Sequence, residues 1–437
     1  MTVTDGGELR EWRRSRGWDV PELARRLRRA AEEPVAAHDG LIRMIRAWER
    51  GDHRLSERYE LLYRRLGLPP GNENGPEPHP APTGSQEGSD PVRRRTFVEL
   101  AGISVVSAVL PTGVGTTPPI DLEPLVLMLT GAMPVSSAGP PDLTGLGVSV
   151  ARARKDYQAC RYAELVGRLP RLLGQLEAAC RCLDGDDGIR ACALSADAYH
   201  VAAGFLLKIG DQGLAHVATD RSMAAALASQ DPLTVGASGR IVTHTLMSSG
   251  HLPAAITTAQ SHAVRLARET GIKTPESLSV YGSVLLRGAV AAAQYGRRGT
   301  AHDMLAEASG AARRVGTGAN LRGTAFGPVN TVMHQVNVAV TLGDAGTAID
   351  LARKIDLSAI TVTERKVTLL IDVARAFFQW GKYEQAHTAL RAAEETAPQE
   401  VAARPLVGSL ARNLAVLPPA GIRRAAEQFA SRIGAPR

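Results

Sequence analysis

Three arginines at helical spacing are the side chains whose type and arrangement most clearly point to a chemistry. They lie in segment 41–51, at Arg43, Arg46 and Arg50. Because an α-helix turns by about 100° per residue, the three guanidinium groups project from one face. A guanidinium can donate two hydrogen bonds to a guanine edge or to a phosphate, so this face suits a polyanion. Ion pairs with nearby carboxylates are the alternative role for each arginine.

The opposite face of this segment is apolar and predicts how it packs. Leu41, Ile45 and Trp48 are spaced i, i+4 and i+7, which is the pattern of a helix that buries one side. The same periodicity predicts three further short helices, at residues 8–16, directly after Asp19, and at residues 56–66. We therefore expect residues 1–68 to form a small bundle of helices around one core.

Motifs at both ends of this bundle resemble the XRE class of helix-turn-helix DNA-binding domains, the type found in phage repressors. The matching residues are Leu9-Arg10-x-x-Arg13-x-x-x-Gly17-Trp18, Glu22-Leu23-Ala24 and Ile45-x-x-Trp48-Glu49-Arg50-Gly51. The sequence departs from the class between the second and third helices, because Arg28–Gly40 is about a dozen residues longer than the usual short turn. The insertion leaves two alternatives, a standard approach to the DNA groove or an altered one.

The resemblance implies a DNA-contacting surface on the third helix, which enters the major groove in this class. The residues expected to read base edges are Ile42, Arg43, Arg46 and Ala47, and those expected to contact phosphates are Arg50 and Arg54. An arginine paired with guanine contributes about 1–3 kcal/mol of discrimination between bases. One such reader has a small interface, so the resemblance also implies a homodimer on an inverted-repeat operator of double-stranded DNA.

The composition is that of a globular protein with an excess of arginine. The chain has 437 residues, 44% of them hydrophobic, and a net charge of +7. Arginine accounts for 45 of the 51 basic residues. A GC-rich coding sequence can produce the same bias, so net charge alone is weak evidence for nucleic-acid binding. Four cysteines do not form a disulfide framework in so long a chain, which favours a reducing cytoplasm.

Two segments between the N-terminal bundle and the rest of the chain differ from both in composition. Residues 69–91 contain seven prolines and little apolar surface, which predicts an extended, flexible linker. Residues 92–147 begin with a run at Arg93–Arg95 that resembles a twin-arginine export signal. Glu99 interrupts its apolar part and the run is too short to span a bilayer, so we expect a packed helix there and no membrane segment. A second short helix is predicted at residues 122–129.

Residues 148–437 consist of Ala- and Leu-rich helical segments with a repeated spacing. At five places between two such segments, a glycine is followed five positions later by an alanine, at Gly210 and Ala215, Gly250 and Ala255, Gly296 and Ala301, Gly343 and Ala348, and Gly381 and Ala386. Glycine permits a left-handed turn, and a small alanine lets two helices approach closely. Cys160 takes the glycine position in a first pair, at residues 149–183, and residues 402–433 form a last pair.

This pattern resembles tetratricopeptide repeats, although the glycines are 40, 46, 47 and 38 residues apart and the usual period is roughly 34 residues. The resemblance implies an all-α chain, in which seven helical pairs stack into a right-handed solenoid with a concave inner surface. A generic helical bundle is the alternative.

One predicted helix in the repeats has a polar stripe on an otherwise apolar sequence. The stripe consists of Asn330, His334 and Asn337, spaced i, i+4 and i+7. Side-chain amides can pair with both the N–H and the C=O of an extended peptide. Further candidates for ligand binding are Arg240, His244 and Tyr281. The alternative is that these residues cap neighbouring turns or face solvent.

The sequence contains no catalytic motif. It lacks a His-Glu-x-x-His helix, a phosphate-binding loop, a nucleophile elbow and a dinucleotide fingerprint. The spacing of Cys160, Cys180, Cys182 and Cys192 matches no zinc site, so these residues are interpreted as small apolar side chains. We therefore expect no enzyme, no cofactor and no metal, and an enzyme of unrecognised type is the weakest hypothesis.

A reader of this class joined to repeats resembles the RRNPP peptide-sensing regulators of Gram-positive bacteria and actinobacterial regulators of the same layout. The resemblance implies cytoplasmic transcription control of the quorum-sensing kind. It also implies homodimerisation through the repeats and a peptide or small-molecule effector in the inner groove. The alternative is a non-enzymatic repeat scaffold that binds a partner protein, with a helix-turn-helix that no longer reads DNA.

Overall fold

The computed structural model describes residues 6–31, 38–50, 57–68, 120–132, 142–316, 320–416 and 420–435. Every regular element within these ranges is a helix, so the predicted all-α class is confirmed. None of the described helices has the length and apolarity needed to cross a membrane. The linker at 69–91, the helix predicted after Arg93–Arg95, Arg54 and the middle of the insertion Arg28–Gly40 lie outside the described residues.

The chain divides into two compact units. The described helices of the N-terminal unit are α1 (Gly6–Ser15), α2 (Val20–Ala30), α3 (His38–Arg50) and α4 (Glu57–Arg65). The face of α3 predicted to be apolar is its buried face, because Leu41 and Ile45 have no exposed surface and Trp48 is 5% exposed. Asp19 caps α2 by accepting a hydrogen bond from the Glu22 amide at 2.6 Å. The predicted core of this bundle is therefore confirmed.

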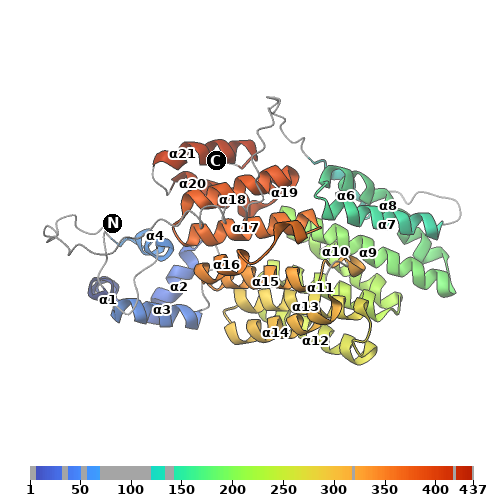
Figure 1. Cartoon of the computed structure of the whole chain (residues 1–437), viewed down its shortest axis with the longest axis horizontal. Coiled ribbons are helices and arrows are strands. Elements are labelled where there is room, and N and C mark those ends of the chain that lie inside the picture. Colours follow the sequence, from blue (N-terminus) through green and yellow to red (C-terminus); the bar gives the residue numbers. More distant parts are fainter. Residues whose placement is uncertain are drawn as a thin grey trace. The chain divides into compact units, whose positions relative to one another are not determined.

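The C-terminal unit begins, in the described residues, with a short helix that packs on the first repeat. This is α6 (Glu123–Leu129), and it contacts α8. The helices that follow, shown in Figure 1, are α7 (Leu143–Gln158), α8 (Tyr162–Cys182), α9 (Gly185–Ile209), α10 (Gln212–Ala228), α11 (Pro232–Ser248), α12 (Leu252–Thr270), α13 (Pro275–Gln294), α14 (Arg298–Val315), α15 (Pro328–Thr341), α16 (Ala345–Ala352), α17 (Thr363–Gln379), α18 (Tyr383–Thr396), α19 (Pro398–Ala403), α20 (Pro405–Val416) and α21 (Ala420–Arg432), with 3-10 turns η1 (Leu321–Gly323) and η2 (Leu357–Ala359). Apart from α6 and the short α19, these α-helices form consecutive pairs.

The glycines predicted at the turns within pairs have the expected backbone conformation. Their φ angles are +82° at Gly210, +80° at Gly250, +78° at Gly296, +85° at Gly343 and +71° at Gly381. The alanine five residues after each one has no exposed surface. Cys160, predicted to replace glycine in the first pair, has a φ of +59°. The repeat pattern was therefore a correct prediction of where helices end and pair.

The first and late pairs of this unit also contact each other, which the repeat pattern does not predict. α17 packs against α7. The Gln158 side chain, at the end of α7, donates a 2.9 Å hydrogen bond to the Gly323 carbonyl. Gln399 accepts hydrogen bonds from the Tyr162 and Ala163 amides at the start of α8. The array of pairs thus turns back on itself.

An ion network joins these early and late helices. The Nζ atom of Lys208, in α9, lies 2.6 Å from Oε1 of Glu364, in α17, and 2.6 Å from Oε1 of Glu400, in α19. Arg404 donates a 2.6 Å hydrogen bond to Glu400, and the Tyr162 hydroxyl donates another. We call Lys208, Glu364, Glu400 and Arg404 the closure network. Lys208, Glu364 and Glu400 have almost no contact with solvent, and the Arg404 side chain is 16% exposed.

Mutual attraction keeps the closure network ionised in spite of burial. Burial opposes the charged form of each carboxylate, but the neighbouring cations hold the pKa of Glu364 well below its ordinary value and lower that of Glu400. Burial also opposes the charged form of Lys208, yet the two carboxylates raise its pKa. Such a network is costly to break, because removal of one member leaves a buried charge without its partner.

We expect Glu400→Gln to lower the free energy of unfolding of the C-terminal unit by about 3 kcal/mol, because Lys208 and Arg404 lose a shared carboxylate. Chemical denaturation of the full chain measures the change. The native pKa of Glu400 is lowered, so its stabilisation is complete above the pKa of an unfolded glutamate and is lost as the pH falls through the native value. The difference between wild type and variant should therefore shrink in acid.

The matched control for this substitution is Glu395→Gln. Glu395 pairs with Arg391 on the surface of α18, where both side chains are more than half exposed. Removing that pair should change the free energy of unfolding by about 0.5 kcal/mol or less. Equal effects of the two substitutions would contradict the structural role of the closure network.

Candidate functional site

The structure describes the side chains of three residues predicted to contact DNA, and two of them are solvent-exposed. Arg46 and Arg50 are exposed, and Ile42 is half-buried against the bundle core. The side chains of Arg43 and Ala47 lie outside the described residues, as does all of Arg54. The exposed arginines therefore occupy the side of α3 opposite its buried face, as the spacing predicts.

Two residues of the motif that resembles the XRE class form a buried clamp between α1 and α3. Arg13 donates two hydrogen bonds to the Glu49 carboxylate, from Nε at 2.6 Å and from Nη2 at 2.9 Å. Its Nη1 donates to the Trp18 carbonyl at 2.7 Å. Hydrogen bonding to Glu49 raises the pKa of Arg13. Arg13 and Glu49 thus hold the helix that carries Arg46 and Arg50, and their part in the motif is structural.

A second candidate site lies inside the C-terminal unit, where successive pairs place basic side chains on their first helices. We call this set the inner basic cluster, and it consists of His200 (α9), Arg240 and His244 (α11), Arg287 (α13), His334 (α15) and Arg365 (α17). The arginines lie close enough to the histidines and to one another to influence their ionisation. Five consecutive pairs of helices therefore contribute basic side chains to one site.

The pKa values in this cluster show how strongly the interior opposes positive charge. Burial, followed by the charge of Arg365, lowers the pKa of Arg240 to about 10. Burial and the charge of Arg240 lower the pKa of Arg287 to about 9. Burial and the charge of Arg365 lower that of His334 to about 3, and the pKa values of His200 and His244 are also well below ordinary. At neutral pH the histidines are uncharged and the arginines are cations.

Carboxylates compensate only part of this positive charge. Arg365 lies 3.2 Å from Glu364, a carboxylate that already belongs to the closure network. Among the described residues, neither Arg240 nor Arg287 has a carboxylate within ion-pair distance. The Nε atoms of both arginines are buried and have no hydrogen-bond partner in that part of the chain. Arg240 does donate from Nη2 to His200 Nε2, because the neutral imidazole can accept.

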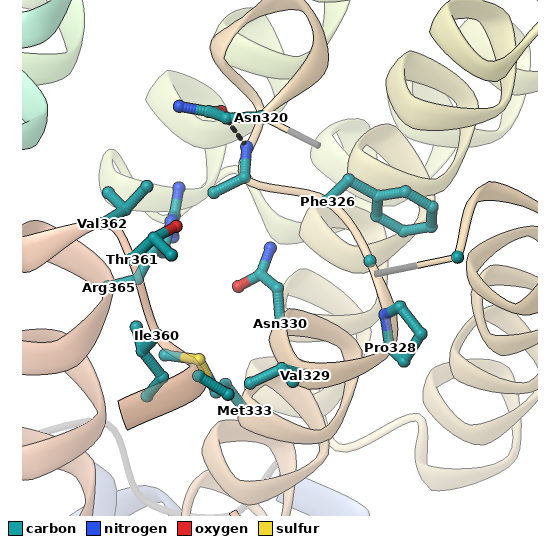
Figure 2. A pocket seen from close by; sticks show the side chains of 14 residues that line it. Asn320, Phe326, Pro328, Val329, Asn330, Met333, Ile360, Thr361, Val362 and Arg365 are labelled. Carbon is teal, nitrogen blue, oxygen red and sulfur yellow. Dashed lines mark hydrogen bonds between the residues drawn. The ribbon is translucent and has the colours of Figure 1, made fainter. Parts of the chain in front are cut away.

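A cavity of about 210 Å³ adjoins the cluster at Arg365. Its wall is formed by the segment before α15, the first turns of α15 and the segment from η2 to α17 (Figure 2). Most of its side chains are apolar, including Phe326, Ile360, Val362 and Met333. The Asn330 amide projects into the middle of this space in Figure 2, and its Oδ1 has no hydrogen-bond partner in the described residues. The cavity thus combines a mostly apolar wall with a few polar side chains, which are Asn320, Asn330, Thr361 and Arg365.

The predicted ligand-binding residues fall into different surroundings. Arg240, His244 and His334 belong to the inner basic cluster, and Asn330 lines the cavity. Asn337 is paired elsewhere, because its side-chain amide donates to both carboxylate oxygens of Asp372, at 3.0 and 2.9 Å. The Tyr281 hydroxyl donates to Glu307 of α14 at 3.1 Å and is not among the cluster residues.

Sequence reasoning did not identify Arg287, Arg365 or Phe326. Arg287 is the only charged residue between Leu278 and Gln294, and a lone cation on such an apolar helix was the available signal. Arg365 follows Glu364, so it resembles an ordinary surface pair in the sequence. The cavity depends on segments that only the fold brings together, and no local pattern marks Phe326.

No family model, curated protein or solved structure matches the chain. Its candidate sites are therefore interpreted from their own geometry. Within the described ranges, no group of three or more histidine, cysteine or acidic side chains could hold a metal ion. Burial raises the pKa of the Cys160 thiol to about 12. The features that have a clear binding chemistry are the exposed arginines of α3 and the inner basic cluster with its cavity.

We expect Glu49→Gln to loosen the N-terminal unit by about 3 kcal/mol, because the largely buried Arg13 charge loses its carboxylate. Hydrogen exchange of the full chain, resolved by mass spectrometry, should show roughly 100-fold faster exchange in α1 and α3. Glu60→Gln is the control, because it removes an i,i+4 pair with Arg64 whose arginine is nearly half exposed. Unchanged protection of α1 and α3 in Glu49→Gln would contradict the clamp.

Proposed function

We propose that the chain is a sequence-specific DNA-binding transcriptional regulator whose activity is controlled by a ligand of the repeat unit. The DNA-binding part of this proposal rests on α3, which has one buried apolar face and one exposed face with arginines. Leu41 and Ile45 on its apolar face are fully buried, whereas Arg46 and Arg50 are exposed. Because packing fixes the orientation of α3, the helix can present its guanidinium groups to the major groove in a defined geometry.

The resemblance to the XRE class supports this proposal through the residues that build the unit. Arg13 and Glu49 are both motif residues, and their paired hydrogen bonds connect α1 to α3. A helix-turn-helix needs such a scaffold, because base recognition depends on a fixed orientation of the third helix. In this proposal Arg43 and Arg46 read base edges, while Arg50 and Arg54 contact phosphates.

The regulatory part of the proposal rests on the inner basic cluster and its cavity. Ligand binding there can control DNA binding only if the ligand has different affinities for two states of the protein. Since the second and sixth pairs are joined by the closure network, a ligand held between them is placed to change how the pairs pack. We propose that the regulator acts in the cytoplasm as a homodimer on an inverted-repeat operator, and that its signal is a peptide or another small molecule.

Gel shifts on the promoter region of the protein's own gene test DNA binding. We expect a specific complex that weakens steeply with salt. The double substitution Arg43→Ala and Arg46→Ala should reduce specific affinity by about ten- to a hundredfold per lost guanine contact and relax the sequence preference. The exposed Arg268 of α12 provides a charge-matched control, and Arg268→Ala should leave the complex unchanged.

Two results would count against the proposal. An intact sequence preference in the double variant would contradict the role given to α3. No salt-sensitive complex with any genomic fragment would favour the alternative of a repeat scaffold that binds a partner protein. Genome-wide capture of DNA with the purified protein extends the same test beyond one promoter.

A further inference from the structure

The interior of the C-terminal unit contains two arginines that have no carboxylate within ion-pair distance among the described residues, although Glu364 offsets part of their charge from farther away. Arg240 and Arg287 lack carboxylate partners there, and each has a buried Nε without an acceptor. Both side chains are half-buried, and a charge that is largely removed from water is normally paired, because desolvation of an unpaired one is costly. An orphan N–H group at a buried site likewise calls for an acceptor. Both features are satisfied together if an anion binds between the two guanidinium groups.

We propose that the inner basic cluster binds the oxyanion group of a small ligand, a carboxylate or a phosphate, through Arg240 and Arg287, while the apolar part of the ligand occupies the adjoining cavity. This inference deepens the proposed function by giving the chemical class of the effector, and it rests on that function only for the regulatory consequence.

The charges of the cluster set the charge of the ligand. Arg365 is offset by Glu364 at 3.2 Å, and the histidines are neutral at pH 7 because their pKa values are lowered. Glu364 and Glu400 also serve Lys208 and Arg404, so part of the Arg365 charge remains together with the charges of Arg240 and Arg287. A monoanion or a dianion offsets most of this charge, whereas a polyanion such as a nucleic acid exceeds both the charge and the space.

The histidines position the arginines and accept further hydrogen bonds. His200 accepts from Arg240, which fixes one end of that guanidinium and leaves its other N–H groups for the ligand. His334 Nδ1 lies 2.9 Å from the Asn330 carbonyl, and since a carbonyl can only accept, Nδ1 carries the proton. The neutral ring therefore has its acceptor at Nε2.

The cavity specifies the part of the ligand beyond the anionic group. Its volume of about 210 Å³ fits a short branched chain, and its apolar wall includes Phe326, Ile360 and Val362. The unpartnered Oδ1 of Asn330 can accept one hydrogen bond from a ligand N–H or O–H. Arg365 lines the cavity and also belongs to the cluster, so it marks where the apolar and anionic parts meet.

The test measures binding of three probes to the full chain by calorimetry, with chloride holding the ionic strength constant. The probes are inorganic phosphate, 4-methylpentanoate and 4-methylpentanamide, which has the same apolar chain without the charge. We expect saturable binding of at least one anion and none of the amide. Binding of phosphate alone identifies a phosphate ligand, and binding of 4-methylpentanoate alone identifies a carboxylate.

Substitutions locate the binding. Arg240→Gln and Arg287→Gln should each weaken anion binding at least tenfold, whereas Arg268→Gln on the surface of α12 should not change it. Arg287→Lys keeps the charge but loses the forked donors, so it should bind with intermediate affinity and serves as the variant that preserves folding. Without the ligand, Arg287→Gln should unfold at the same temperature as wild type or higher, because it removes a half-buried cation that has no carboxylate within ion-pair distance.

A third readout is the ionisation of His334. A bound anion stabilises the imidazolium form, so the pKa of His334, followed by NMR of its ring, should rise when the probe binds. The inference is overturned if neither anion binds, if the amide binds as well as the acid, or if the arginine substitutions leave affinity unchanged. It is also overturned if Arg287→Gln destabilises the ligand-free protein, since the arginine would then serve the fold.

The two proposals can fail separately. Anion binding that depends on Arg240 and Arg287 but does not alter the gel shift would support the site and contradict ligand control of DNA binding. A specific, salt-sensitive DNA complex without anion binding would support the reader and overturn the inference about the cluster.

Discussion

The interior of the repeat unit depends on one buried set of ion pairs. Lys208 lies 2.6 Å from both Glu364 and Glu400, which come from α17 and α19. These contacts join the second pair of helices to the sixth and to the helix after it. A stack of pairs has only neighbour-to-neighbour interfaces, so an added contact between distant pairs constrains the whole array. The closure network thus joins α9 and α17, the first and last of the helices that carry the inner basic cluster.

Closure also determines the electrostatics of the interior. The network uses two carboxylates, Glu364 and Glu400, to neutralise Lys208, Arg404 and part of Arg365. Arg240 and Arg287 are left in the same low-dielectric region without carboxylates of their own among the described residues. Burial, followed by the charge of a neighbouring arginine, lowers the pKa of each. A protein that keeps such a costly arrangement commonly does so for binding, because the free energy lost in the empty site is recovered when an anion enters.

The parts of the fold that local patterns control could be predicted from the sequence. The apolar stripe at Leu41, Ile45 and Trp48 predicted a buried face, and the spacing from Gly210 to Ala215 predicted a left-handed turn followed by a close helix contact. Contacts between distant segments could not be predicted this way. Nothing near Lys208 indicates that its partners are Glu364 and Glu400, because the geometry of successive repeats decides which pairs meet.

The same difference between local patterns and contacts of distant segments applies to the candidate sites. His334 and Arg240 were recognised as polar residues on apolar helices, and Asn337 shared that pattern, yet the structure pairs its amide with Asp372. Arg287 could not be predicted as a site residue, because a single cation in an Ala-rich helix forms no periodic pattern. In the sequence, Glu49 of α3 cannot be distinguished from the other carboxylates near the arginines, whereas the structure shows that it is 6% exposed and accepts hydrogen bonds from Arg13.

The central claim is that the enclosed interior holds an anion between two uncompensated arginines. Crystals of the full chain soaked in selenate, a tetrahedral dianion with anomalous scattering, test it most directly. The account predicts an anomalous peak within hydrogen-bond distance of the guanidinium groups of both Arg240 and Arg287. Selenate bound only at surface positions, with solvent or a protein carboxylate between these two arginines, would contradict it.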